Sequence, residues 1–380
     1  MTREAFGSAW LKAAAAAGAF AGAPALAESD RGLRFGASYT SDSFVNARGG
    51  LKTGFSQMGL FELTAEAEGK AFGIEGIEGF ATGQYVHGRS LSGTLVGDAQ
   101  VGSNIDAPDG LRLFEAWLSV PLGTDAYLKT GLIDLNGEFD VQDVGALFLN
   151  SSHGIGPDFS QSGRNGPSIF PTTSAAVMAG VKTGRLSFRA GLFDAVAGDP
   201  DRPGRTVVRF PGQSGLLAVA ETEIRLSEEA EVQVGAWSYT TEFETIPDGS
   251  RKRGNRGAYV LAESALGHIG GEPAEGWVRA GTAETRFNAI GLYLGGGIAF
   301  GPEGRRFGLA VAHARLGSPA RQPAFEDPGN AETSVEMTYA RAIGDRLIVQ
   351  PDVQYVINPG FERGLRNSLT LGVRVQLRIF

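Results

Sequence analysis

The chain has no cysteine among its 380 residues, which excludes disulfide bonds and thiolate ligands for a metal. Histidine is scarce as well. The four histidines, His87, His153, His268 and His313, do not have the spacing of metal ligands. We therefore expect no metal and no other cofactor.

Basic residues are also fewer than acidic residues. The sequence has 34 basic and 42 acidic residues, a formal net charge of −8, and no basic tract. Proteins that bind nucleic acid usually carry a basic patch or stripe. We therefore expect no nucleic-acid partner.

Long apolar runs are missing apart from one near the N-terminus. Arg3 and Lys12 precede the run AAAAAGAFAGAPALA, which ends in small residues. This order is typical of a secretory signal peptide, and the run is short for the alternative, an uncleaved membrane anchor. We predict a cleaved signal peptide over residues 1–27 and a single domain over residues 28–380.

The sequence is rich in glycine, with 56 residues, and in segments where apolar and polar residues alternate. In SLTLGVRVQLRI (368–379), every second residue from Leu369 to Ile379 is apolar, and those between are polar or glycine. Segments 186–192 and 347–354 follow a similar pattern. A period of two indicates β-strands with one apolar face, and glycine suits tight turns between them.

Two all-β architectures produce such strands. In a soluble sandwich the apolar face forms the core, whereas in an outer-membrane barrel it faces lipid and the polar face lines the lumen. Predicted export, strands of about ten residues and a final aromatic residue, Phe380, favour the barrel. We predict an all-β fold, a transmembrane antiparallel β-barrel of about 16 strands that encloses an aqueous channel. Phe380 itself falls on the polar phase of its strand, which a bulge or a frayed end would explain.

Charged residues within the strands should point into the lumen, because a basic side chain in the middle of the lipid face costs about 2–4 kcal/mol. On the strand LRLFEAWLSV (111–120), this phase places Phe114, Ala116 and Leu118 on the lipid face and Glu115 and Trp117 inside. The charges expected inside are Glu115, Lys129, Arg189, Glu221, Glu223, Arg225, Arg279, Glu336 and Asp352, with some near strand ends at head-group level.

Four segments stand out by their length and unusual composition. They are FLNSSHGIGPDFSQSGRNGPSIFP (148–171), LVGDAQVGSNIDAPDGLRLFEAWL (95–118), GLIDLNGEFD (131–140) and VQPDVQYVINPG (349–360). Together they make the chain resemble the carbohydrate-selective porins of the OprB family.

The resemblance implies a barrel in the bacterial outer membrane through which sugars, typically glucose and related monosaccharides, diffuse passively. The expected partners are these solutes, outer-membrane lipid and lipopolysaccharide. The barrel-assembly machinery would recognise the C-terminal strand that ends at Phe380. A homotrimer is a possible assembly, and the sequence leaves the number of copies open.

A wide barrel needs a constriction to select solutes, and two long segments could fold inward to form it. They are 150–171 and 87–110, where glycine, proline and polar residues favour compact irregular loops. Arg164 could present its planar donor fork at the narrowing, next to Asn165. The alternative is an external loop in which Arg164 forms a structural ion pair.

A sugar needs planar hydrogen-bonding groups for its hydroxyls and an aromatic surface for its C–H face. Trp117 could stack on the sugar, or belong to the aromatic girdle of the membrane interface. Asp352 and Gln354 could bind hydroxyls, or bond across the lumen. Asp134 and Asp194, at corresponding places in two similar segments, are expected to cap loops. The candidate residues for the pore lining or constriction are Glu115, Trp117, Lys129, Arg164, Asn165, Arg189, Arg279, Glu336, Asp352 and Gln354.

Two other functions remain open at this stage. A general or weakly anion-selective porin would lack a sugar site, and lumen arginines could attract anions despite the net negative charge. A more remote alternative is an outer-membrane lipid hydrolase that uses Ser151, Ser152 and His153, although no flanking motif supports a catalytic triad. We expect a channel and not an enzyme.

Overall fold

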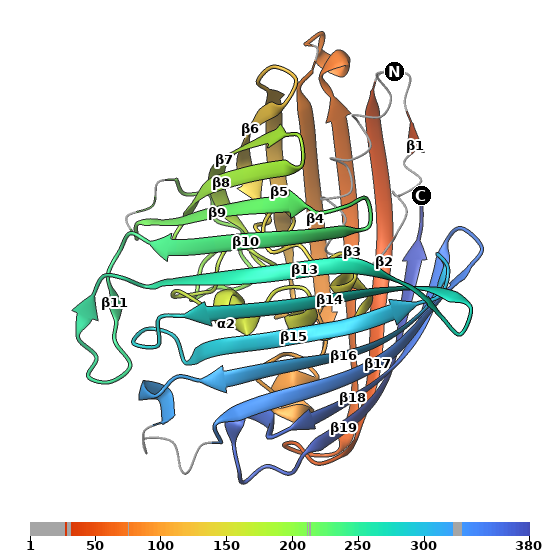
Figure 1. Cartoon of the computed structure of the whole chain (residues 1–380), viewed down its shortest axis with the longest axis vertical. Coiled ribbons are helices and arrows are strands. Elements are labelled where there is room, and N and C mark those ends of the chain that lie inside the picture. Colours follow the sequence, from red (N-terminus) through yellow and green to blue (C-terminus); the bar gives the residue numbers. More distant parts are fainter. Residues whose placement is uncertain (1–26, 29–31, 75, 211, 213, 322–328) are drawn as a thin grey trace.

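The computed structural model describes residues 27–28, 32–74, 76–210, 212, 214–321 and 329–380. Within these residues, sixteen antiparallel strands form one barrel, which closes where β19 (Ser368–Arg378) pairs with β2 (Leu33–Arg48) (Figure 1). A further short strand, β1 (Ala27–Glu28), pairs with the first residues of β2. The predicted antiparallel barrel of about 16 strands is confirmed. The predicted signal peptide lies almost entirely outside the described residues.

Each remaining strand of the barrel pairs with its neighbours in chain order. These strands are β3 (Gly54–Glu68), β4 (Glu78–Gly88), β5 (Gly110–Pro121), β6 (Ala126–Ile133), β7 (Ser174–Thr183), β8 (Leu186–Asp194), β9 (Leu216–Arg225), β10 (Ala230–Tyr239), β13 (Arg256–Ile269), β14 (Glu272–Ala283), β15 (Ile290–Phe300), β16 (Arg305–Leu316), β17 (Ala331–Ile343) and β18 (Leu347–Ile357). Two short strands, β11 (Phe243–Glu244) and β12 (Arg251–Lys252), form a separate hairpin between β10 and β13.

In the described part of the chain, helical structure is limited to single turns in the connections. The turns are η3 (Gly69–Phe72), η4 (Ser92–Val96), η5 (Gly145–Leu147), η6 (Ser151–His153), α2 (Pro157–Ser160), η7 (Pro319–Arg321) and η8 (Pro359–Phe361). Among the described residues, no helix is long and apolar enough to span a membrane.

The two ends of the barrel differ in the length of their connections. Tight turns such as 122–125, 184–185 and 270–271 join strands at one end, where β2 also begins and β19 ends. We call this the turn end. The opposite end, which we call the loop end, carries long connections, among them 89–109 and 134–173. Outer-membrane barrels have this arrangement, with short periplasmic turns and longer extracellular loops.

The strand faces alternate as the sequence predicts. On β19, Leu371 and Leu377 point outward with 47% and 42% of their surface exposed, whereas Arg374 and Gln376 point inward with 2% and 1% exposed. The outward side chains therefore form an apolar wall, and the polar and charged ones gather inside the barrel.

The predicted orientation of Phe114 on β5 is wrong because of a β-bulge. The pairing of β4 with β5 moves from Thr82–Glu115 to Gly83–Leu113, which leaves Phe114 without a partner on β4. Two residues then oppose one, and the faces change phase at this point. Phe114 consequently lies inside the barrel with 1% exposed, not on the lipid face as its phase predicted, and its ring packs edge-on against Phe170.

A similar irregularity accounts for Phe380. The backbone N–H of Ile379 donates to the carbonyl oxygen of Ala37, and the N–H of Ala37 donates to the carbonyl oxygen of Phe380. Two terminal residues thus oppose Ala37, which agrees with the bulge considered from the sequence. Both side chains are exposed, although they are consecutive in the chain.

The predicted caps at Asp134 and Asp194 are confirmed. The Oδ1 atom of Asp134 accepts a hydrogen bond from the backbone N–H of Asn136, at 3.0 Å. Asp194 accepts one from Val196 in the same way, at 3.1 Å. Both are Asx turns, which satisfy backbone groups where β6 and β8 end.

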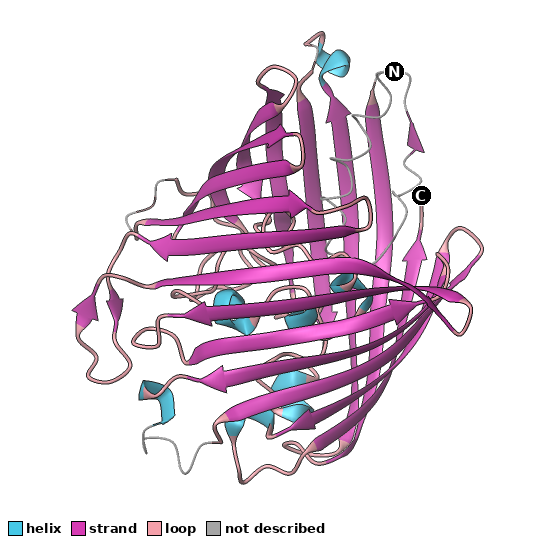
Figure 2. Ribbon diagram, viewed as in Figure 1, coloured by secondary structure: helices cyan, strands magenta, loops and turns pink. Residues whose placement is uncertain are grey.

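The two long connections 89–109 and 134–173, which we call loop A and loop B, fold into the barrel. Figure 2 shows their helical turns behind the strands of the front wall, and α2 contacts both β14 and β15. Inward folding of these segments was predicted, but loop B begins at residue 134, well before the predicted start at residue 150.

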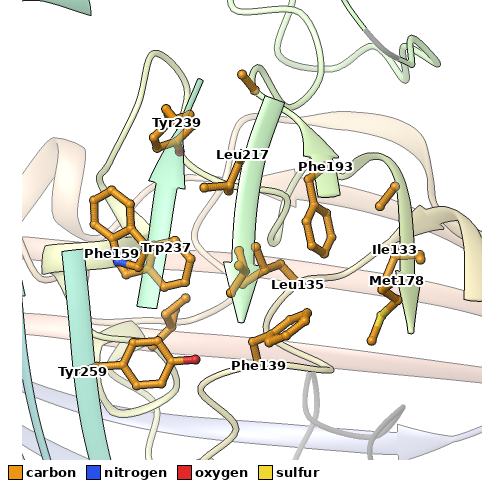
Figure 3. Packing of buried hydrophobic residues seen from close by; sticks show 14 of the residues in the cluster. Ile133, Leu135, Phe139, Phe159, Met178, Phe193, Leu217, Trp237, Tyr239 and Tyr259 are labelled. Carbon is orange, nitrogen blue, oxygen red and sulfur yellow. The ribbon is translucent and has the colours of Figure 1, made fainter. Parts of the chain in front are cut away.

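Apolar side chains fix one half of loop B to the wall. Leu135, Phe139 and Phe159 of the loop are fully buried in a cluster with inward aromatic residues of the strands (Figure 3). Phe159 stacks on Trp237 of β10, with ring centroids 5.0 Å apart and planes within 5°. Inward aromatic residues in this part of the barrel therefore serve to hold the loop.

Three glutamates of the wall hold the loops in a second way, which we call a glutamate clamp. In each clamp, both carboxylate oxygens accept hydrogen bonds from consecutive backbone N–H groups of a loop. Glu332 binds the amides of residues 99 and 100 at 2.9 Å each. Glu263 binds those of 143 and 144 at 3.0 and 2.8 Å, and Glu336 binds those of 149 and 150 at 2.6 and 2.9 Å. Hydrogen bonds to a carboxylate are roughly twice as strong as neutral ones, so the clamps define the path of both loops across the barrel.

Replacing a clamp carboxylate should loosen the loop that it holds. Glu263→Gln keeps one acceptor oxygen but turns an NH2 group toward a backbone N–H, at a cost of about 1–3 kcal/mol for the unpaired amide. We expect a larger and noisier single-channel conductance in planar bilayers. Glu62→Gln is the matched control, because Glu62 accepts hydrogen bonds from Gln84 and Ser38 of the neighbouring wall strands. Equal conductance traces for both variants would contradict the clamp role.

Candidate functional site

Loops A and B leave a hollow between them inside the barrel. The hollow is small and partly open to solvent. The lining comes from both loops and consists of small, amide-bearing and apolar side chains: Asn104, Asn136, Val141, Gln142, Gly145, Ala146, Phe148 and Gly154. Two glutamate clamps, at residues 143–144 and 149–150, flank the central part of this lining.

The three amide side chains of the hollow are held in fixed orientations. Asn136 donates to the carbonyl oxygens of residues 139, 140 and 154, at 3.1–3.3 Å. Gln142 donates through Nε2 to the carbonyl oxygen of Gly154, at 3.1 Å. The Oε1 atom of Gln142 is buried and accepts no hydrogen bond from the described residues. The amide groups of Asn136 and Gln142 therefore have fixed orientations, and the Oε1 atom of Gln142 is an acceptor without a donor.

Asn104 connects the hollow to the wall. Its Oδ1 atom accepts a hydrogen bond from Arg374 of β19, at 2.6 Å. Arg374 also forms two hydrogen bonds to Asp42 of β2, at 2.7 and 2.8 Å, and Asp42 accepts a third from Ser103 of loop A. Arg374 was not among the predicted site residues, although the alternation in the last strand already placed it on the inner face.

Arg279 holds loop B to β14. Its guanidinium forms ion pairs with Asp140 and Asp158, each with a shortest distance of 2.7 Å, and all three side chains are fully buried. The rings of Tyr259 and Tyr293 lie beside it, 5.2 and 5.3 Å from the guanidinium carbon. Arg279 points inward as predicted, but its donors are occupied by the loop.

Trp117 and its neighbours form a compact polar group on β5 and β6. The ammonium of Lys129 lies 3.5 Å from the centroid of the Trp117 ring and pairs with Glu138 of loop B. The indole N–H donates to Glu115 at 3.2 Å, and Phe80 stacks against the ring. Lys129 and Phe80 thus occupy much of the aromatic surface that was expected to face a sugar.

The remaining predicted wall residues are also engaged with protein groups. Arg189 pairs with Glu221 at 2.7 Å and with Glu223 at 3.3 Å. Gln354 donates to the carbonyl oxygen of Gly102 in loop A at 2.7 Å and to Asp352 at 3.0 Å. Glu336 forms its clamp on loop B. Of the two roles considered for Asp352 and Gln354, these contacts favour bonding within the lumen.

Arg164 and Asn165 lie apart from this group. Both belong to an exposed turn that follows α2, and neither lines the hollow. Asn165 donates to the carbonyl oxygen of Ala197, in the connection between β8 and β9, at 2.6 Å. The structure therefore brings together the predicted wall residues with loops A and B, whereas Arg164 and Asn165 do not line the hollow.

The Ser151–Ser152–His153 segment does not form a hydrolytic site. His153 is fully buried against Phe148 and Trp277 inside the barrel. Neither of its ring nitrogens has a hydrogen-bond partner among the described residues. A lipid hydrolase would need its histidine within reach of a nucleophile and of lipid, which this position does not provide.

Comparison with known proteins gives one family and several related folds. The model of the carbohydrate-selective porin OprB family matches residues 52–378. Among proteins with curated functions, none matches the chain in sequence.

Several solved structures share the fold. The high-pH structure of Pseudomonas putida OprB has a TM-score of 0.81 and 16% identity, and the alignment covers 92% of this chain and 95% of that one. The DcaP outer membrane channel of Acinetobacter baumannii has a TM-score of 0.57 and 8% identity, with 93% and 99% covered. A mutant of the Rh. blastica porin has a TM-score of 0.54 and 10% identity, with 91% and 100% covered.

The family match covers most of the chain, and the fold is that of porins, which are channels and not enzymes. The porin fold and the family imply a place in the outer membrane, and the apolar outer wall agrees with contact to lipid. The chain belongs to the carbohydrate-selective porin family OprB.

Proposed function

We propose that this porin admits neutral monosaccharides such as glucose by passive diffusion through the hollow between loops A and B. The observation that carries the proposal is the glutamate-clamped pair of loops, which occupies much of the barrel and leaves a lining of amide groups. A barrel of 16 strands without such loops would be a wide water-filled channel. Selection by size and by hydrogen bonding would then arise at the hollow.

The lining suits a neutral, hydroxyl-rich solute. The Oε1 atom of Gln142 is buried without a partner among the described residues, and in this proposal it accepts a hydrogen bond from a sugar hydroxyl when a solute enters the hollow. Asn104 and Asn136 supply further amide groups. Such contacts are individually weak, which allows the solute to leave as well as to enter.

The ion pairs of three inward arginines favour a neutral substrate over an anion. Arg279, Arg189 and Arg374 each form at least one ion pair with a carboxylate. The charges of these three arginines are therefore balanced within a few ångströms, which weakens the field that they contribute to the pore. A general anion-selective porin is the less favoured alternative. In this proposal, the predicted wall residues act mainly by holding the loops that shape the passage.

We extend the proposal to the export and assembly of the barrel and to its lipid surroundings. The chain would be exported with residues 1–27 as a cleaved signal peptide, and the assembly machinery would read the strand that ends at Phe380. Lipopolysaccharide would surround the loop end of the barrel.

Glucose should block the ionic current through single channels in planar bilayers, in a saturable manner at millimolar concentration. Sucrose, which is about twice as large, should block weakly or be excluded. The measurement is single-channel conductance with each sugar titrated in turn, with dextran at matched viscosity as the control. Current that glucose reduces only as much as viscosity predicts would refute a sugar site.

Gln142→Leu should weaken the glucose block by removing the free acceptor of the hollow. One neutral hydrogen bond contributes about 1 kcal/mol, so the half-blocking concentration should rise roughly fivefold. Gln376→Leu is the matched control, because Gln376 also points inward with an unpaired Oε1 but does not line the hollow. The site is misplaced if the control variant loses the block and Gln142→Leu keeps it.

A further inference from the structure

Three basic residues lie where the barrel closes, at the loop end. Arg48 is the last residue of β2, Lys52 lies in the turn that joins β2 to β3, and Arg366 lies shortly before β19. We call these three residues the basic cluster. All three are exposed, and the ion pairs among the described residues include none of them. Their charges are therefore available to a partner outside the chain.

A β-bulge directs Arg48 to the outer face of the barrel. The pairing of β19 with β2 moves from Thr370–Asn46 to Leu369–Arg48, so Ala47 has no partner on β19. Asn46 points inward with 0% exposed, and simple alternation would turn Arg48 inward as well. Because of the bulge, Arg48 instead stands opposite Leu369, which belongs to the outward phase of β19. Directly opposed residues share a face of the sheet, so Arg48 lies on the outer surface.

Apolar and aromatic side chains show how high the cluster lies on the outer wall. On the turn-end side of Arg48, Val45 and Leu371 point outward with 43% and 47% exposed, as part of the apolar wall. Tyr355 of β18 is also exposed near the loop end, and its hydroxyl accepts a hydrogen bond from Asn367 at 3.1 Å. Tyrosine is typical of the boundary between hydrocarbon and head groups. Since the long loops of outer-membrane barrels are extracellular, the cluster lies at the head groups of the outer leaflet.

Hydrogen bonds hold the segments that carry the cluster at fixed places. The N–H of Gly50 donates to the carbonyl oxygen of Arg366 at 2.8 Å. The side-chain amide of Asn46 donates to the carbonyl oxygen of Lys52 at 2.9 Å. Gly49 has a φ of 72°, and a Cβ atom there would lie 2.0 Å from a backbone oxygen of the segment before β19. Glycine at this position therefore lets the turn and that segment approach closely.

The surroundings of the cluster are basic, although the whole chain has a formal net charge of −8. The connections 49–53 and 358–367 contain Lys52, Arg363 and Arg366 and a single acidic residue, Glu362. A local excess of positive charge on a protein surface attracts anionic groups, and basic residues near a membrane surface attract anionic lipids. The expected partner of the cluster is therefore an anionic lipid head group.

We propose that the basic cluster binds the phosphate groups of lipopolysaccharide in the outer leaflet. The planar fork of an arginine matches phosphate with two parallel hydrogen bonds, and a lysine binds it as a point charge. The acyl chains of the same molecule lie along the apolar wall next to Leu371. The proposal rests on the outer-membrane placement of the barrel. It is independent of the proposed sugar site, which lies inside.

Arg341 and Arg346 provide a matched contrast at the turn end. They lie at the end of β17 and in the turn to β18. Both are exposed, and neither takes part in the ion pairs of the described residues. They equal Arg48 and Arg366 in charge and number, but they lie at the periplasmic end of the barrel.

Binding of lipid A, the phosphate-bearing part of lipopolysaccharide, tests the proposal. The purified barrel is titrated with diphosphoryl lipid A and with the same lipid after removal of both phosphates. Native mass spectrometry measures the fraction of barrels that carry the lipid. We expect tight binding of the phosphorylated form only. Arg48→Gln with Arg366→Gln should lower its affinity roughly 30-fold, whereas Arg341→Gln with Arg346→Gln should leave the affinity unchanged.

Three results of this titration would overturn the proposal. The first is equal binding of the two forms of lipid A. The second is an equal loss of affinity in the two double variants. The third is phosphatidylglycerol bound as tightly as lipid A, which would reduce the cluster to an unspecific attraction for anionic lipid.

The glucose block of the single-channel current is a separate readout of the interior. We expect it to be the same in the intact chain and in Arg48→Gln with Arg366→Gln, because the cluster lies on the outer face. Heat-modifiable migration on gels verifies that each variant is folded. A double variant that loses the glucose block together with lipid A would show a disturbed barrel and would contradict a direct lipid contact. An intact chain without glucose block refutes the sugar site alone, since lipid binding is measured independently.

Discussion

The hydrocarbon layer accepts no unpaired polar group, and this constraint governs the whole molecule. It requires every backbone N–H and C=O of the membrane-spanning strands to find a partner on an adjacent strand, so the sheet has to close, as it does between β19 and β2. It also drives the charged side chains of the strands to the inside. Many charged side chains consequently lie inside the barrel, and each of them needs a partner nearby.

The loops provide much of the balance. Glu332, Glu263 and Glu336 would be unpaired carboxylates on the inner wall, but each accepts two backbone amides from loop A or B. Arg279 is balanced by Asp140 and Asp158 in the opposite sense, with the cation on the wall and the anions on the loop. The same loops therefore satisfy the polar groups of the wall and narrow the channel.

This arrangement changes how inward residues of a porin should be interpreted. An arginine or a tryptophan on the lumen face looks like a contact for solute, yet Arg279 and Trp117 are engaged by loop B and by Lys129. The side chains with free capacity are less conspicuous. Gln142 lies in a loop, has no charge, and keeps its side-chain oxygen without a partner among the described residues. The proposed solute site therefore rests on hydrogen-bond capacity that remains after folding and not on residue type.

The sequence by itself determined the class of fold, the inward direction of most strand charges and the two segments that fold into the barrel. These follow from a period of two, from the energetic cost of charge in lipid and from runs of glycine and proline, which are all local properties. The family resemblance also rested on local segments, and the family match confirmed it. Only the tertiary structure decided which inner side chains are already used. A bulge of one residue placed Phe114 inside, the clamps joined residues more than 100 positions apart, and Arg164 fell on an exposed turn. Pairings of this kind depend on register and on loop paths across the closed barrel, and a strand pattern holds no information about either.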